Sequence, residues 1–155
     1  MTLDQFVKTN TGVPLSFWNN GSVQCVDVVR AYVRDVLKLP LSEQPEPLGN
    51  DGSAEWFFTR HETRPLQKRN FDRVEHQTGM IPPKGSILVF GPTVSNRFGH
   101  VAVCLEAGAL SIAVFEQDGI ENSKAKREGR TQRGCFVGQW KYDRLLGWLV
   151  PKGMV

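Results

Sequence analysis

Residues 100–115 read HVAVCLEAGALSIAVF and form the most apolar stretch of the chain. A glutamate, a glycine and a serine interrupt this stretch, so we expect strands here rather than a membrane span. The two apolar runs are His100–Leu105 and Leu110–Glu116, and Glu106–Ala109 separates them. Two short strands with so short a connection predict an antiparallel hairpin.

The rest of the second half continues the strand pattern. Further strands are expected at Gly85–Phe90, Cys135–Tyr142 and Leu145–Val150. The segment Lys124–Arg133 is basic and contains glycine, and we predict a loop there. Such a basic segment is usually a solvated surface loop. The alternative is that it binds anionic polymers.

The first half has helical periodicity instead. Apolar residues recur at helical spacing in Val23–Leu37, and Pro40 ends this segment. Two shorter helices are expected at Asp4–Lys8 and Ala54–Phe58, whereas Leu66–Val74 has no clear pattern. Helices followed by an antiparallel sheet predict an α+β fold in which the N-terminal helices pack on the sheet.

Length and composition fit one domain over residues 1–155. The chain is 40% hydrophobic and 23% charged, as is typical of globular proteins. Its three cysteines are an odd number and too few to form a disulfide framework. The net charge of +3 is compatible with an anionic partner but gives no reason to expect nucleic acid. The opening MTLDQFVKTNTG has no apolar core, so we expect no signal peptide.

Cys25 lies where a polar, glycine-containing loop becomes the main helix. Taken alone, it is a small core residue, a metal ligand or a nucleophile. No Cys-x-x-Cys or His-Glu-x-x-His pattern occurs, so we expect no metal and no cofactor. Free N–H groups at a helix N-terminus favour an anion and can lower a thiol pKa from about 8.5 to roughly 3.5–7.5. This position therefore favours a nucleophilic thiolate.

A thiolate nucleophile needs an acid–base partner and a group that orients that partner. Two of the three histidines, His61 and His76, lie in the polar middle section and are unpromising. His100 opens the first strand of the hairpin, and Glu116 closes the second. Because antiparallel neighbours bring such ends together, we expect Glu116 to reach the His100 ring. Cysteine, histidine and carboxylate so arranged predict a catalytic triad.

Several segments of the chain are similar, in order and spacing, to one known family. They read QCVDVVRAYV, GNDGSAEW, PPKGSILVFG, GHVAVC, VFEQDG and YDRLLGWLVP. On these segments the chain resembles the CHAP family, the cysteine- and histidine-dependent amidohydrolase/peptidase domains of phage lysins and bacterial wall hydrolases. The resemblance implies a papain-like (NlpC/P60-like) α+β fold and cleavage of amide bonds in peptidoglycan. It assigns Cys25 as nucleophile, His100 as general base and acid, and Glu116 as the residue that orients His100.

The chain departs from the family pattern at two places. The family commonly has Asn where this chain has Asp118, which can accept a hydrogen bond from imidazole but cannot donate one. We include Asp118 in the catalytic set. Many phage members carry an Asp-rich calcium loop before the cysteine, whereas this chain reads LSFWNNGSVQ there. Since calcium prefers charged oxygen ligands, we expect no calcium site of that kind.

The remaining site residues are expected around the thiol. The backbone N–H of Cys25 is the expected oxyanion donor, and Gln24 is a candidate second donor. Trp18, Trp56 and Phe98 fall in loops that flank the triad, and they are candidates for an aromatic groove that binds an extended wall strand.

Other notable residues have structural interpretations. Asp27 either caps the helix start or takes part in function. Cys104, Cys135, Trp140 and Trp148 fall in apolar strand settings, where we expect core positions.

The resemblance implies an endopeptidase or N-acetylmuramoyl-L-alanine amidase, such as a phage lysin. Such a protein is made in the host cytoplasm and acts at the wall after release, or is associated with the virion. Bacterial peptidoglycan is the expected partner, with anionic wall polymers or a separate wall-binding or virion chain as further candidates. Two alternatives stay open. One is a non-catalytic wall-binding or virion structural module of the same fold, and the other is an intracellular cysteine peptidase with a non-wall substrate.

Overall fold

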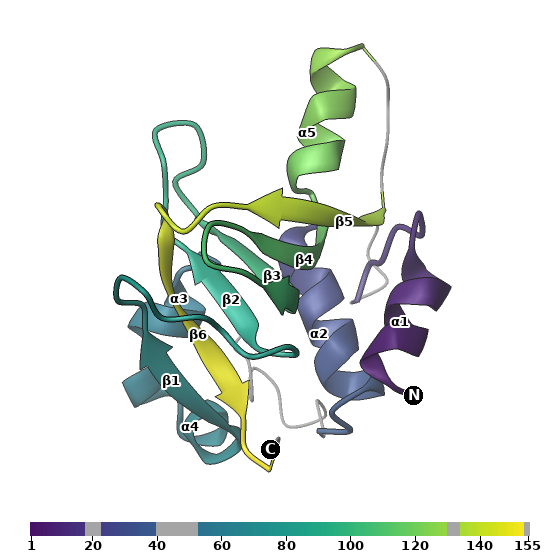
Figure 1. Ribbon diagram of the computed structural model, residues 1–155. Helices are drawn as coiled ribbons and strands as arrows, with labels where there is room; N and C mark the ends of the chain where they lie inside the picture. Colours follow the sequence, from purple (N-terminus) through teal and green to yellow (C-terminus); the bar gives the residue numbers. More distant parts are fainter. Residues whose placement is uncertain (18–22, 40–52, 130–133, 154–155) are drawn as a thin grey trace.

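The computed structural model describes residues 1–17, 23–39, 53–129 and 134–153 (Figure 1). Trp18 and most of the loop expected between Pro40 and Ser53 lie outside the described residues.

A six-stranded antiparallel sheet forms the centre of the molecule, in the order β1-β6-β2-β3-β4-β5 (Figure 1). Its strands are β1 (Phe71–Glu75), β2 (Ile87–Phe90), β3 (His100–Ala107), β4 (Ile112–Gln117), β5 (Cys135–Trp140) and β6 (Leu145–Pro151). Strands β2 to β5 pair in chain order, as the expected hairpin requires. The last strand, β6, crosses back to lie between β1 and β2.

Five α-helices and one short 3₁₀ helix occur in the described residues. The α-helices are α1 (Leu3–Asn10), α2 (Cys25–Asp35), α3 (Trp56–Thr59), α4 (Pro65–Asn70) and α5 (Ile120–Arg127), and the 3₁₀ helix is His61–Thr63. Helix α2 packs against β3 and β4, and α5 projects beside the edge strand β5 (Figure 1). This arrangement is the expected α+β fold. Within the described residues, no helix has the length and apolar character that crossing a membrane requires.

The sheet is buried on both faces. Val101 and Val103 of β3 join the cluster that includes α2, whereas Ala102 and Cys104 join a second cluster on the opposite face. Side chains alternate between the faces of a strand. His100 therefore lies on the face of Ala102, and its position at the end of β3 leaves it beside the cavity that the first residue of α2, Cys25, also lines.

Three expectations about local structure are corrected. The main helix begins at Cys25 rather than Val23. The patternless segment Leu66–Val74 holds most of α4 and most of β1. The basic segment expected as a loop is in part α5, which buries Ala125 and carries its lysines on the surface. The sequence of α5, IENSKAKR, is mostly polar, so it has no apolar stripe for periodicity to detect.

Candidate active site

The start of α2 is fixed by a buried carboxylate. Asp27 Oδ2 accepts a hydrogen bond from the backbone N–H of Gln24 at 2.8 Å, and Oδ1 accepts one from Phe17 N–H at 2.9 Å. Asp27 thus ties the loop before the helix to its first turn, which favours the structural interpretation of this residue. Cys25 is the first helical residue and is partly exposed.

Gln117 is a buried residue that the sequence did not single out. Its amide oxygen accepts a hydrogen bond from Leu15 N–H at 2.7 Å. Its amide nitrogen donates to the carbonyl oxygens of Leu15 at 2.8 Å and of Gln24 at 2.9 Å. Since Gln117 and Glu116 are neighbours on β4, their side chains point to opposite faces. Gln117 therefore fastens the segment that carries Cys25 to the strand that carries Glu116.

His100 and Glu116 form a buried pair on the other face of the sheet. Nε2 of His100 lies 2.7 Å from Oε2 of Glu116, and their side chains are only 6% and 2% exposed. The expected contact between these residues is thus present. A Cβ built on Gly119 or Gly138 would overlap the Glu116 carboxylate, so only glycine leaves room for it at these positions.

The charge state of His100 reflects two opposing effects. Burial lowers its pKa, but hydrogen bonds with Cys25 and Glu116 outweigh burial and raise the pKa to about 10. Nε2 of the ring faces Glu116, and His100 also shares the wall of one cavity with Cys25. The imidazole therefore contacts the carboxylate on the thiol's side of the sheet end, and it favours the protonated form.

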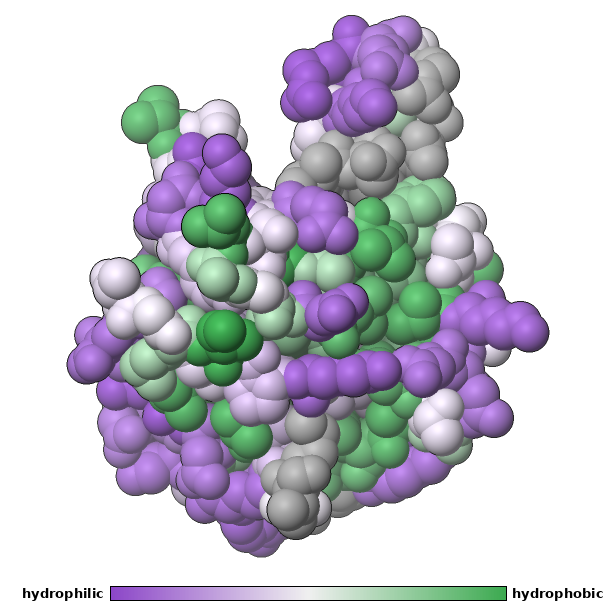
Figure 2. All heavy atoms as spheres, viewed as in Figure 1, coloured by the Kyte–Doolittle hydropathy of each residue, from purple (hydrophilic) through white to green (hydrophobic). Residues whose placement is uncertain are grey.

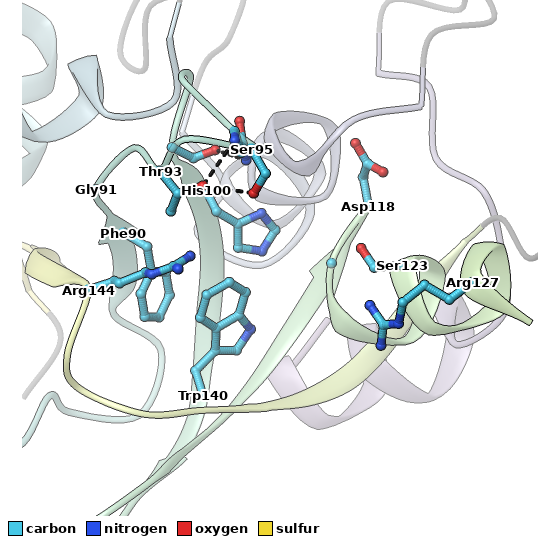
Figure 3. A pocket seen from close by; sticks show the side chains of 13 residues that line it. Phe90, Gly91, Thr93, Ser95, His100, Asp118, Ser123, Arg127, Trp140 and Arg144 are labelled. Carbon is cyan, nitrogen blue, oxygen red and sulfur yellow. Dashed lines mark hydrogen bonds between the residues drawn. The ribbon is translucent and has the colours of Figure 1, made fainter.

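Trp140 belongs to this site, although the sequence indicated a core position. Its indole N–H donates to Glu116 Oε2 at 2.7 Å. Its ring stacks on the His100 ring, with centroids 5.0 Å apart and 15° between the planes (Figure 3). Trp140 ends β5, which pairs with β4, and this pairing brings it to the face of Glu116. That long-range pairing cannot be read from a local pattern.

Asp118 lies at the mouth of the site rather than within the buried pair. Its backbone φ of 55° is in the left-handed region, where β4 turns towards α5. Partial burial raises the pKa of its carboxyl, while the positive charges of His100 and Lys126 lower it. Nε2 of His100 bonds to Glu116 and not to Asp118.

Two adjoining cavities share the His100 side of the site. One, of about 250 Å³, is lined by Gln24, Cys25 and Phe98, among others. The other, of about 290 Å³, extends from His100 towards α5 (Figure 3). Both contain His100 and Asp118 in their walls.

The candidate groove aromatics differ in their positions. Phe98 is half exposed at the cavity of Cys25. Trp56 lines neither cavity, and its ring lies 3.2 Å from the guanidinium carbon of Arg60. Trp18 is outside the described residues.

The other two cysteines are core residues, as expected. Cys104 and Cys135 are fully buried, and burial raises the pKa of each thiol to about 12. Trp148 is also buried. Among the residues that the structure describes, no three His, Cys, Asp or Glu side chains gather as metal ligands would.

Comparison with known proteins gives one family and several similar structures. The model of the CHAP domain family matches residues 16–118. The crystal structure of a wild type endolysin, LysIME-EF1, superposes with a TM-score of 0.62 at 13% identity, over 97% of this chain and 64% of that one. Ly7917 superposes with a TM-score of 0.65 at 17% identity, over 97% and 62%.

A second structure of Ly7917, described as holding the hydrolyzing product of MDP, gives a TM-score of 0.62 at 16% identity, over 96% and 61%. The chain thus spans less than two thirds of the length of these chains. At such identities the likeness concerns the fold. A comparison with curated proteins gives no significant match.

Proposed function

The chain belongs to the CHAP domain family, and we propose that it is a cysteine-dependent hydrolase of an amide bond in bacterial peptidoglycan. The observation that carries this proposal is the buried contact between His100 and Glu116, next to a cavity whose wall His100 shares with Cys25. A protonated imidazole beside a thiol at a helix N-terminus is the arrangement that activates a sulfur nucleophile.

The first half-reaction is acylation of Cys25. Its thiolate attacks the amide carbonyl carbon, and the carbonyl electrons move to oxygen. The backbone N–H of Cys25, which has no intrahelical acceptor at this helix position, donates to that oxyanion. Gln24, which lines the same cavity, is the proposed second donor. His100 gives its proton to the leaving nitrogen, the C–N bond breaks and a thioester remains.

The second half-reaction frees the enzyme. Water attacks the thioester carbonyl and gives a proton to His100, and the C–S bond breaks to release a carboxylic acid. Throughout, Glu116 holds the imidazole in one orientation and stabilises its positive form. Asp118 lies at the mouth of the site. We propose that its carboxylate contacts the substrate there and contributes to the electrostatic potential around His100. Phe98 is the proposed aromatic contact for the wall strand.

The endolysin neighbours support a lytic role as a phage endolysin that acts at the bacterial wall. In this proposal residues 1–155 form one catalytic domain. Both an endopeptidase and an N-acetylmuramoyl-L-alanine amidase use this chemistry, so the products must identify the bond.

The test is digestion of purified sacculi of several cross-bridge types by the wild type and by Cys25→Ala, with products identified by mass spectrometry. Soluble fragments with new amino termini from the wild type alone would support the proposal and identify the bond. If neither protein releases fragments while both bind the sacculi, the chain is a binding module of the same fold. If sacculi are neither bound nor cut, the substrate is not the wall.

A further inference from the structure

The larger cavity is lined in part by charged side chains that have no role in the proposed hydrolytic steps. Its walls come from α5 on one side and from the β2–β3 connection and the β5–β6 turn on the other, and Figure 2 shows the surface hollowed beside the hydrophilic α5. Two arginines, Arg127 and Arg144, reach it from opposite sides (Figure 3). The rings of Phe90, His100 and Trp140 line its base.

Neither arginine pairs with a carboxylate of the part of the chain that the structure describes. Among the described residues, neither guanidinium forms an ion pair, although Arg34 and three lysines do. Among the described residues that line the cavity, Asp118 is the acidic one, so their summed formal charge is positive even with His100 neutral. Ser123 and Thr93 add hydroxyl groups. A concave positive site with hydroxyls suits a carboxylate, which a guanidinium can bind through two parallel hydrogen bonds.

The position of the cavity indicates which half of the substrate enters it. Cys25 lines the smaller cavity and is absent from the larger one. The acyl half of the substrate is bonded to Cys25 in the thioester, so it occupies the smaller cavity. The amine half leaves past His100, which protonates it, and the larger cavity lies on that side of His100.

We propose that the larger cavity binds the leaving, amine-bearing half of a wall peptide, and that Arg127 and Arg144 select a peptide with a free carboxylate there. This inference rests on the proposed function, because the assignment of the leaving half assumes the acyl transfer described above. Arg127 and Arg144 are in this view specificity residues, whereas Cys25, His100 and Glu116 perform the chemistry.

The test compares binding of two forms of one wall peptide, L-Ala–D-Glu–L-Lys–D-Ala. One form has free carboxyl groups and the other has both carboxyl groups amidated. Calorimetric titration uses the full chain with Cys25→Ala, so that no peptide is cleaved, and then the same chain with Arg127→Gln or Arg144→Gln. We expect the free acid to bind about tenfold more tightly than the amide, and each arginine substitution to remove most of that preference.

Lys124→Gln is the matched control, since it removes one positive charge from α5 at a residue that does not line the cavity. The control should keep the preference for the acid. Equal binding of both peptides, a preference that survives both arginine substitutions, or an equal loss in the lysine control would each overturn the inference. Displacement of the peptide by a phosphate-rich wall polymer, but not by excess free-acid peptide, would also overturn it.

Sacculus digestion by the same arginine variants, with Cys25 intact, separates this inference from the proposed function. A wild type that releases no fragments would overturn the proposed function and the assignment of the leaving half with it. A wild type that digests sacculi, while the peptides show no carboxylate preference, would overturn the arginine inference alone.

Discussion

The indole N–H of Trp140 donates to Oε2 of Glu116 at 2.7 Å, and this same oxygen lies 2.7 Å from Nε2 of His100. One carboxylate oxygen therefore joins two rings that also stack on each other. Because Trp140 comes from β5 and His100 from β3, the carboxylate on β4 is held from both neighbouring strands. The orientation of the imidazole thus depends on Trp140, which does not line the cavity of Cys25.

Trp140→Phe keeps an aromatic ring at this position and removes the N–H donor. We expect kcat on sacculi to fall about tenfold with little change in KM, because the lost bond positions Glu116 and does not hold substrate. The pH profile of kcat should shift with the His100 pKa, which a purely structural defect would not produce. Trp148→Phe, a change at a buried tryptophan of β6, is the control. Equal losses in both variants would contradict the positioning role.

The three cysteines should differ sharply in reactivity. Cys25 is partly exposed and lines a cavity together with His100, whereas Cys104 and Cys135 are buried, which raises the pKa of each of their thiols to about 12. We expect iodoacetamide at neutral pH to modify Cys25 alone in the folded protein and to abolish hydrolysis at one label per chain. Peptide mapping by mass spectrometry locates the label. Labelling of Cys104 before Cys25 would contradict the assignment of the nucleophile.

The pKa values of His61 and His100 should lie on opposite sides of the ordinary histidine value of 6.5. Burial lowers the pKa of His61, while hydrogen bonds with Cys25 and Glu116 outweigh burial and raise that of His100 to about 10. Imidazole resonances in NMR spectra, assigned by His→Gln substitution, report both values. Glu116→Gln removes a negative charge from the His100 ring, so we expect that variant to lower the His100 pKa. An unchanged value would show that Glu116 does not control the ring.

The same shift predicts how stability depends on pH. Because the pKa of His100 is higher in the folded chain than in the unfolded chain, its protonation stabilises the fold. This stabilisation is complete at pH values below the unfolded pKa of 6.5. This stabilisation is lost as the pH rises towards about 10. The free energy of unfolding of the wild type should therefore fall over this range relative to His100→Gln. Urea titrations of both proteins at pH 6 and pH 10 provide the check, and a constant difference between them would contradict the assignment.

The sequence predicted the parts of the site that local pattern determines. The contact between His100 and Glu116 follows from one hairpin, and the place of Cys25 follows from the start of one amphipathic helix. Trp140 and Gln117 could not be found in this way, because their partners depend on strand pairing and on loops distant in sequence. Helix α5 was missed because its sequence, IENSKAKR, is mostly polar and has no apolar stripe, yet it supplies Arg127 to the larger cavity.

Gln117→Leu should destabilise the fold more than an ordinary polar-to-apolar change. The substitution removes the hydrogen-bond partner of the Leu15 N–H and of the Leu15 C=O. It also removes one of the hydrogen bonds that the Gln24 carbonyl accepts. Loss of a partner for buried polar groups costs about 1–3 kcal/mol, so we expect the free energy of unfolding to fall by roughly that amount or more. Urea denaturation measures the change. Gln139→Leu, on the exposed side of β5, is the control and should have almost no effect.

Gly138→Ala tests whether the space around Glu116 is essential. In an ordinary strand, alanine would be tolerated or would stabilise slightly, since glycine weakens strands. Here a Cβ would overlap the Glu116 carboxylate, so the carboxylate must move from His100 or the strand must shift. We expect a loss of about 1–3 kcal/mol in the free energy of unfolding, typical of overpacking. We also expect kcat to fall by about a hundredfold, because the general acid–base loses its orientation.

Gly108→Ala is the matched control for this substitution. Its Cβ would meet only the Ser111 carbonyl oxygen at an ordinary distance of 3.7 Å, in the hairpin between β3 and β4. This variant should keep wild-type activity and stability. If Gly138→Ala loses stability but keeps the wild-type kcat and His100 pKa, then the position of the Glu116 carboxylate does not govern catalysis. A parallel loss of kcat and a lowered His100 pKa would show that it does.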